Sequence, residues 1–158
     1  MAHRSRTLRM RRRGTTAVEA AVVLPVFLLF VFGLIEYGRL QLVSNLLNSA
    51  CRGGARYGAT EGVSAAAAQG KVEQVLGAAI DISDLTVVVK DAAVFDNGGP
   101  LPSTAADYNA MPNLALENAE PRQLFLVRAS VGYNDIAFVP FSILDGVTLH
   151  GQAFMRHE

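Results

Sequence analysis

The chain has 158 residues, a formal net charge of zero at pH 7 and a single cysteine, Cys51. This length suits one small domain with an attached segment, and a lone cysteine excludes an intrachain disulfide and a cysteine-rich metal site. The zero charge averages two unlike parts, because residues 1–13 carry six arginines and no acid, whereas residues 40–158 carry seven basic and twelve acidic residues. Such an asymmetry has to be explained by any account of the chain's function.

Residues 15–36 are predicted to form a transmembrane helix. Sixteen residues from Ala20 to Ile35 follow one another without a charge, and twelve of them are Val, Leu, Ile or Phe. A helix of about 21 residues rises about 31 Å, close to the thickness of the hydrocarbon core of a bilayer. The twelve apolar side chains favour insertion by about 4 to 7 kcal/mol, whereas Glu19 costs at most about 3 kcal/mol even at mid-membrane. We therefore expect this segment to span a membrane.

The basic leader over residues 1–14 predicts the orientation of this span. Arg11, Arg12 and Arg13 lie directly before it, and positively charged flanks stay in the cytoplasm. We therefore expect a cytoplasmic N-terminus and an extracytoplasmic C-terminal domain, an explanation that suits the arginines better than nucleic-acid binding. A cleaved secretory signal is not expected, because the bulky and charged residues of GLIEYGRLQL follow the apolar core where a small-x-small site would stand.

The chain beyond the span predicts an α+β domain. Residues 37–58 place apolar side chains at spacings of three and four, as in an amphipathic helix that continues the membrane helix into water. Residues 64–79 are alanine-rich and indicate a second helix. Three runs that are β-branched or alternate in polarity predict strands: 85–90, 123–133 and 147–155. The expected domain over residues 59–158 therefore holds one further helix and a roughly three-stranded antiparallel sheet.

The residues offer little for catalysis. The three histidines, His3, His150 and His157, are not spaced as metal ligands on one element, and no phosphate-binding or nucleophile motif occurs. We expect no metal, no cofactor and no enzymatic activity. His150 alternates with apolar neighbours and is predicted to lie at the surface, and His157 is predicted to lie at a frayed end. Cys51 falls on the apolar seam of the amphipathic helix, so we interpret it as a packing residue, with an intermolecular disulfide as the alternative.

Glu19 is the one acid at the edge of the apolar run. Thr16 and Glu19 have the spacing of a capping box, with Thr16 as the N-cap of a helix that begins there. A carboxylate in the first turn is also stabilised by the positive end of the helix dipole. A helix start would therefore suffice to explain this residue.

The run RRRGTTAVEAAVVLPVFLLFVFGLIEYGRL combines a basic leader, Gly14, a hydrophobic helix and an acid five residues beyond the glycine. It resembles the prepilin processing signature and, within it, the TadE-like family, whose pattern is also matched by Pro25, Glu36 and Arg39. The stretch NSACRGGARYGA and the terminal FMRHE resemble that family as well. The resemblance is strong over residues 11–58 and weak through most of the remainder.

The resemblance implies a pilin-like fold and a minor pseudopilin that assists assembly of Flp-type (tight-adherence) pili. In that family's wider group a prepilin peptidase cuts after the glycine, which implies cleavage between Gly14 and Thr15 and makes Glu19 the fifth residue of the mature chain. Glu19 could then neutralise the new amine of Thr15 on a neighbouring subunit, since an unpaired charge there is costly. The implied partners are membrane lipid, the peptidase and other pilins or pseudopilins, at the bacterial inner membrane.

Two alternatives stay open from the residues. Residues 96–122 show little periodicity, which indicates either a functional surface loop or an element that the pattern does not reveal. The first alternative is an unprocessed, anchored binding module that uses this loop as its contact surface. The second is a membrane-bound enzyme, which requires a pocket with converging His, Asp or Glu side chains.

Overall fold

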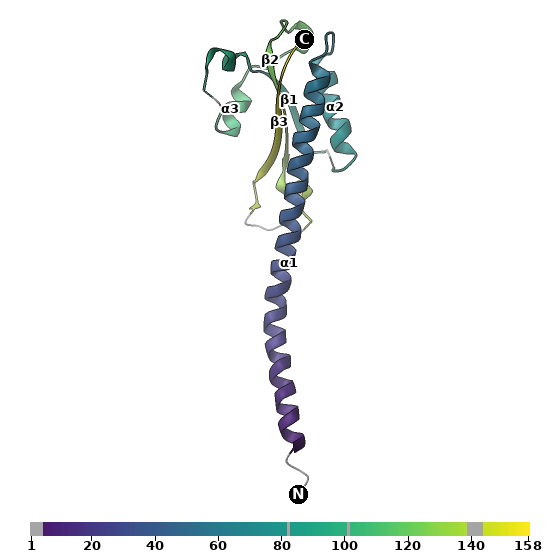
Figure 1. The fold of residues 1–158 in the computed structure, drawn as a ribbon, viewed down its shortest axis with the longest axis vertical. Coiled ribbons are helices and arrows are strands. Elements are labelled where there is room, and N and C mark those ends of the chain that lie inside the picture. The colour runs from purple at the N-terminus through teal and green to yellow at the C-terminus, as the bar shows by residue number, and fades with distance from the viewer. Residues whose placement is uncertain (1–4, 82, 101, 139–143) are drawn as a thin grey trace. The chain divides into compact units, whose positions relative to one another are not determined.

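The computed structural model describes the backbone of residues 5–81, 83–100, 102–138 and 144–158, with side chains from Thr16 onward except that of Asn97. Two compact units divide the chain, Met1–Arg39 and Leu40–Glu158. The helices and strands in chain order are α1 (Ser5–Gly58), α2 (Ala65–Gly77), β1 (Thr86–Asp91), α3 (Ala105–Ala110), β2 (Leu124–Gly132), α4 (Tyr133–Ile136) and β3 (Thr148–Arg156), with 3-10 helices η1 (Ala93–Asn97) and η2 (Leu116–Asn118) (Figure 1).

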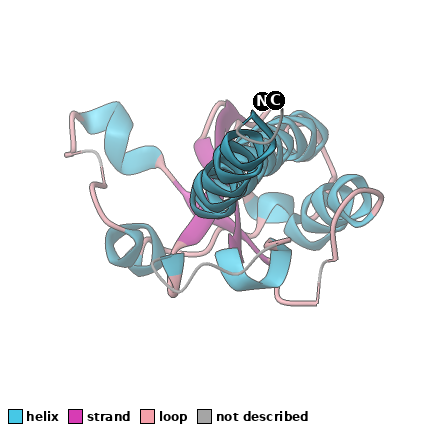
Figure 2. Ribbon diagram, turned by 90° about the horizontal axis from the view of Figure 1, so that it is seen from below, coloured by secondary structure: helices cyan, strands magenta, loops and turns pink. Residues whose placement is uncertain are grey.

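The strands form one antiparallel sheet, as predicted, and their order in the sheet is β1-β2-β3. Figure 2 shows the strands in magenta. In its register Val127 of β2 lies between Val89 of β1 and Ala153 of β3. These three side chains are buried in the main apolar core, and because side chains alternate along a strand, every second residue of each strand faces that core. The fold class is therefore α+β, with both predicted helices beyond the span packed on the same core.

The last part of α1 supplies the ridge that covers this face of the sheet. Its residues Val43, Leu47, Cys51 and Ala55 recur at a spacing of four and are fully or almost fully buried. Helix α2 adds a second ridge, whose buried residues are Ala68, Val72 and Leu76. The N-cap of α2 is Ser64, whose hydroxyl accepts a hydrogen bond from the Ala67 amide.

Three glycines let these elements come close. A Cβ added to Gly54 would run into the Val72 side chain of α2, and one added to Gly58 would lie 3.0 Å from the Ala68 Cβ. A Cβ added to Gly151 of β3 would run into the α1 backbone at Leu47. Glycine is needed at these positions because helices and a strand approach there with no room for a side chain.

Part of the chain between β1 and β2 covers some of the opposite face of the sheet, with α3 packed on β2. This stretch contains η1, α3 and η2, so the predicted loop at residues 96–122 holds elements that periodicity did not reveal. Thr104 and Asp107 form a capping box at the start of α3. Further on, the Asp91 amide donates to the Pro112 carbonyl and the Leu114 amide to that of Val89, which extends the sheet by a short bridge beside β1.

Two predictions about the ends of elements are wrong. Helix α1 begins at Ser5 and has no acid in its first turn, so Thr16 is not its N-cap and Glu19 does not belong to a capping box. The Arg, Leu and Met residues of the leader are good helix formers and extend the helix backwards. At the other end His157 is buried rather than frayed, because its amide donates to the Gln123 carbonyl and the next amide donates to Ala59 of the α1–α2 loop.

Candidate processing and assembly segment

The predicted processing site lies inside α1. Gly14 and Thr15, and the topology residues Arg11, Arg12 and Arg13, all belong to this helix. Side chains are described from the next residue, Thr16, onward. In the uncut chain the glycine is therefore a position within a helix rather than the residue that precedes one.

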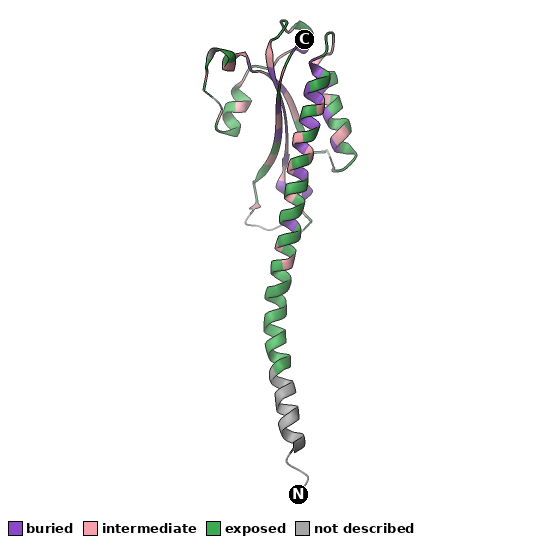
Figure 3. Ribbon diagram, in the orientation of Figure 1, coloured by how far each residue is buried: buried purple, intermediate pink, exposed green. Residues whose placement is uncertain are grey.

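The helix surface that follows is apolar and uncovered. Every residue from Thr16 to Phe30 is exposed, among them Val22, Val26 and Phe27, and Figure 3 shows this stretch in the colour of exposed residues. Among the described residues, one helix is long and apolar enough, by length and composition, to cross a membrane. So large an uncovered apolar surface marks contact with a membrane or a partner.

Glu19 is exposed within this apolar surface. It lies fourteen residues after Ser5, where α1 begins, so the dipole at the helix start, whose effect fades within the first turn, does not stabilise it in the uncut chain. A position in the first turn of a helix therefore does not explain Glu19 when residues 1–14 are present. Removal of residues 1–14 is what would place it there.

The other residues of the membrane-helix motif have different surroundings. Helix α1 continues through Pro25 without interruption. Glu36 is buried, whereas Arg39, three residues later, is exposed. An open apolar hollow on the helix surface is lined by Val22, Val23, Val26, Phe27 and Phe30.

The stretch NSACRGGARYGA lies partly in the domain core, and Cys51 is one of its buried residues. The Cys51 thiol donates a hydrogen bond to the Gly151 carbonyl across 3.3 Å, and burial raises the pKa of this thiol to about 11. Asn48 accepts a hydrogen bond from the Gln152 amide on the same strand, across 3.2 Å. The interpretation of Cys51 as a packing residue is confirmed, and the residues around it fix α1 to β3.

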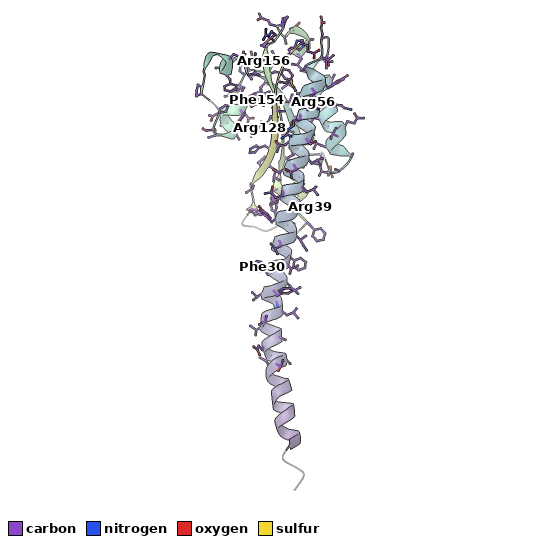
Figure 4. All side chains as sticks on the ribbon, viewed as in Figure 1. Phe30, Arg39, Arg56, Arg128, Phe154 and Arg156 are labelled. Carbon is purple, nitrogen blue, oxygen red and sulfur yellow. The ribbon has the colours of Figure 1, made fainter. Side chains whose placement is uncertain are left out.

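A polar cluster on the other face of the sheet was not predicted. The Arg128 guanidinium of β2 is almost fully buried and lies 4.0 Å from the ring centre of Tyr108 in α3 (Figure 4). The guanidinium donates a hydrogen bond to the side-chain oxygen of Gln152 across 2.8 Å, and the side-chain nitrogen of Gln152 donates to the Tyr108 hydroxyl across 3.2 Å. The buried Lys90 ammonium of β1 donates to the carbonyls of Asn109 and Met111, at the end of α3.

This cluster holds α3 on the sheet and does not resemble a catalytic centre. Its two cations are satisfied by an aromatic ring, an amide and main-chain carbonyls, which are structural partners. No group of three or more His, Cys, Asp or Glu that could hold a metal occurs among the described residues. His150 is exposed, as predicted. The sequence TAAD, with Thr104 and Asp107 in capping-box spacing, was the one local signal for α3.

Comparison with known proteins bears on the first third of the chain. A family model described as "TadE-like protein" matches residues 14–56, which include the exposed apolar stretch and most of the ridge of α1 that packs on the sheet. No curated protein and no solved structure matches the chain.

Proposed function

We propose, from the match of residues 14–56 to the model of the TadE-like family, that this chain belongs to that family of pilus components and is a minor pseudopilin that assists assembly of Flp-type (tight-adherence) pili. The observation that carries the proposal is the uncovered apolar surface of α1 with Glu19 at its N-terminal edge. A surface of this kind suits lipid and the helices of neighbouring subunits. The proposal assigns the chain a role in assembly and no reaction.

The membrane segment at residues 15–36 is proposed to cross the bacterial inner membrane once. The leader arginines keep the N-terminus in the cytoplasm and place the unit Leu40–Glu158 outside. The hollow lined by Val22, Val26 and Phe30 offers a place for an apolar side chain of an adjacent helix. Helices associate in lipid mainly by such close packing.

A prepilin peptidase is proposed to cut between Gly14 and Thr15. The cut removes six arginines that would repel one another in a bundle of helices. It also places Glu19 near a new helix start, where the dipole stabilises a carboxylate. The new amine of Thr15 needs a counter-charge in apolar surroundings, because an unpaired charge there is expensive. Glu19 of a neighbouring subunit supplies that charge and favours one axial stagger between subunits.

The processing step is tested by expressing the full chain with and without a prepilin peptidase and sequencing the N-terminus of the membrane-extracted protein. We expect a chain that starts at Thr15 only when the peptidase is present. Gly14→Val should block the cut, whereas Gly33→Val, in the same helix where an added side chain meets nothing within 4 Å, should leave it unchanged. A chain that keeps its leader in the presence of the peptidase rules out processing but not anchoring.

Glu19→Ala separates the assembly role from that of an unprocessed binding module. We expect this variant to insert in the membrane and to lose most piliation, since the new amine then lacks its partner. Normal piliation would favour the alternative in which the segment at residues 96–122 is the contact surface. That alternative has some support, because α3 is held by polar contacts and has no buried residue.

A further inference from the structure

Large apolar side chains are exposed at one end of the unit Leu40–Glu158. Leu42 of α1 is 62% exposed, Phe138 after α4 is 68% exposed and Val147 before β3 is 44% exposed. Single exposed apolar residues need no explanation, but a group of large ones at one end of a domain does. We call these three residues the interfacial surface.

The contacts within the unit place these residues at the same end. Leu47 of α1 lies against Gly151 of β3, and twelve residues later the Ala59 carbonyl accepts the amide of Glu158. Helix α1 and strand β3 therefore run side by side in the same direction. The beginning of this part of α1 accordingly lies beside the beginning of β3, at Thr148.

Strand pairing brings the last residue of β2 and the first residue of β3 to that end as well. Thr148 pairs with Gly132, the last residue of β2, and α4 follows directly. The Tyr133 amide at the start of α4 donates to the Val147 carbonyl across 2.8 Å, and Ile136 of α4 is buried in the apolar core. Phe138 comes two residues after Ile136, so it emerges from this end of the core.

The membrane anchor keeps this end of the unit close to the bilayer. The uncharged apolar run ends at Ile35, five residues before Leu40. Five residues span about 8 Å as a helix and at most about 18 Å when fully extended. The polar layer on each side of a bilayer is several Å thick. The Leu40 end is thus held within reach of that layer whatever the arrangement of the two units.

We propose that the interfacial surface enters the boundary between headgroups and acyl chains and gives the domain a second membrane contact besides the anchor helix. The proposal rests on the proposed membrane anchor. Exposed Phe and Leu side chains suit this boundary. Asp135 and Asp145, both exposed, flank Phe138 and Val147, so attraction to anionic lipid is not the cause and the contact forms on zwitterionic lipid at any salt concentration. Its effect is to fix the tilt of the domain on the membrane.

The chain contains no tryptophan, so Phe138→Trp introduces one fluorescent reporter at an exposed position. The full chain with this change is reconstituted in phosphatidylcholine bilayers that contain lipids brominated either near the headgroup or near the end of the acyl chain. We expect a blue-shifted emission that loses most of its intensity with the shallow bromines and little with the deep ones. Raising the salt concentration should not change the result.

Two matched variants separate the possible outcomes. Tyr57→Trp replaces a half-exposed aromatic residue near the other end of α1 and should not be quenched by either lipid. Phe27→Trp, within the apolar run, should be quenched if the anchor spans the bilayer. Quenching of Phe27→Trp without quenching of Phe138→Trp overturns the second contact alone. Absence of quenching in both overturns the anchor and, with it, this proposal.

Discussion

Gly151 is a residue at which α1 comes very close to the sheet. A side chain there would meet the α1 backbone at Leu47 and Asn48 rather than the movable end of a side chain. The Gly151 carbonyl also accepts the Cys51 thiol. A glycine on β3 and a small residue on α1 thus set the distance between the helix and the sheet.

Gly151→Ala should destabilise the domain by about 1–3 kcal/mol, the usual cost of forcing an extra group into a packed core. Unfolding of the full chain in detergent micelles, followed by circular dichroism in urea, measures the change. Gly70→Ala is the control, because an added side chain on this exposed face of α2 meets nothing within 4 Å and should stabilise the helix by about 0.5–1 kcal/mol. Equal stability of the two variants would contradict the close approach of α1 and β3.

Cys51 should resist alkylation in the folded chain. Burial raises the pKa of its thiol from 9.0 to about 11, so at pH 8 only about one thiol in a thousand is the reactive thiolate. A raised pKa stabilises the fold below pH 9, and this contribution is lost as the pH rises from 9 to 11. Mass spectrometry after iodoacetamide treatment should show no label until denaturant is added. The control is Ser49→Cys, at an exposed position of the same helix, which should take up one label at once. Rapid labelling of Cys51 in the unaltered chain would instead favour the alternative that this residue forms an intermolecular disulfide.

At the scale of elements, α3 differs from α2 in what holds it. Helix α2 buries three apolar side chains, whereas α3 buries none. Helix α3 is held by the cation–π contact between Tyr108 and Arg128 and by hydrogen bonds from the Lys90 ammonium to carbonyls at its C-terminal end. A lysine at a helix C-terminus satisfies free carbonyls and the negative end of the dipole. Polar anchors of this kind make α3 the helix that should open first.

Lys90→Met should loosen α3 without unfolding the sheet. Loss of the two hydrogen bonds costs about 1 kcal/mol, which corresponds to about fivefold faster amide exchange in α3. Hydrogen–deuterium exchange of the full chain, read by peptide, measures this and should show no change in β2. Lys71→Met is the control, because this exposed lysine bonds only to Gln74 on its own helix. If amide exchange became equally faster in α3 and in β2, Lys90 would stabilise the whole sheet and not α3 alone.

The same difference explains which elements the sequence could predict. The end of α1, the helix α2 and all three strands bury apolar residues with a regular period, and their predicted bounds agree with the structure to within about two residues. Helix α3 has no buried face and hence no periodic signal. The burial of Lys90 and Arg128 depends on chain about twenty residues away in sequence, which a local pattern does not contain. In the candidate segment, the residue pattern predicted the exposed apolar run, but the helical leader before Gly14 moved Glu19 away from a helix start.

At the scale of the whole molecule, the charges separate into a basic leader and an acidic remainder. The six arginines of residues 1–13 precede the apolar run, and the residues from 40 onward carry a net charge of −5. Positive charge within about 15–20 residues of a span decides its orientation, whereas acidic residues contribute little. We therefore propose that the leader sets the orientation of the membrane span.

An alkaline phosphatase fused after Glu158 should be active, since this enzyme folds correctly only outside the cytoplasm. Replacing Arg11, Arg12 and Arg13 by glutamate should lower that activity, because part of the chains then insert in the opposite orientation. Replacing Arg52 and Arg56 by glutamate changes charge beyond the span and should leave the activity nearly unchanged. Activity that is insensitive to the leader would show that the apolar run orients itself by other means.

The alignment of α1 with β3 has a mechanical consequence. Contacts between them begin at Leu47 and Gly151 and continue to Ala59 and Glu158. A force applied at Leu40 along the axis of this part of α1 acts along this shared direction, so it loads all of these contacts in shear at the same time. Contacts that are loaded in shear have to break together, so we expect this part of α1 to resist being pulled off the sheet along its own axis.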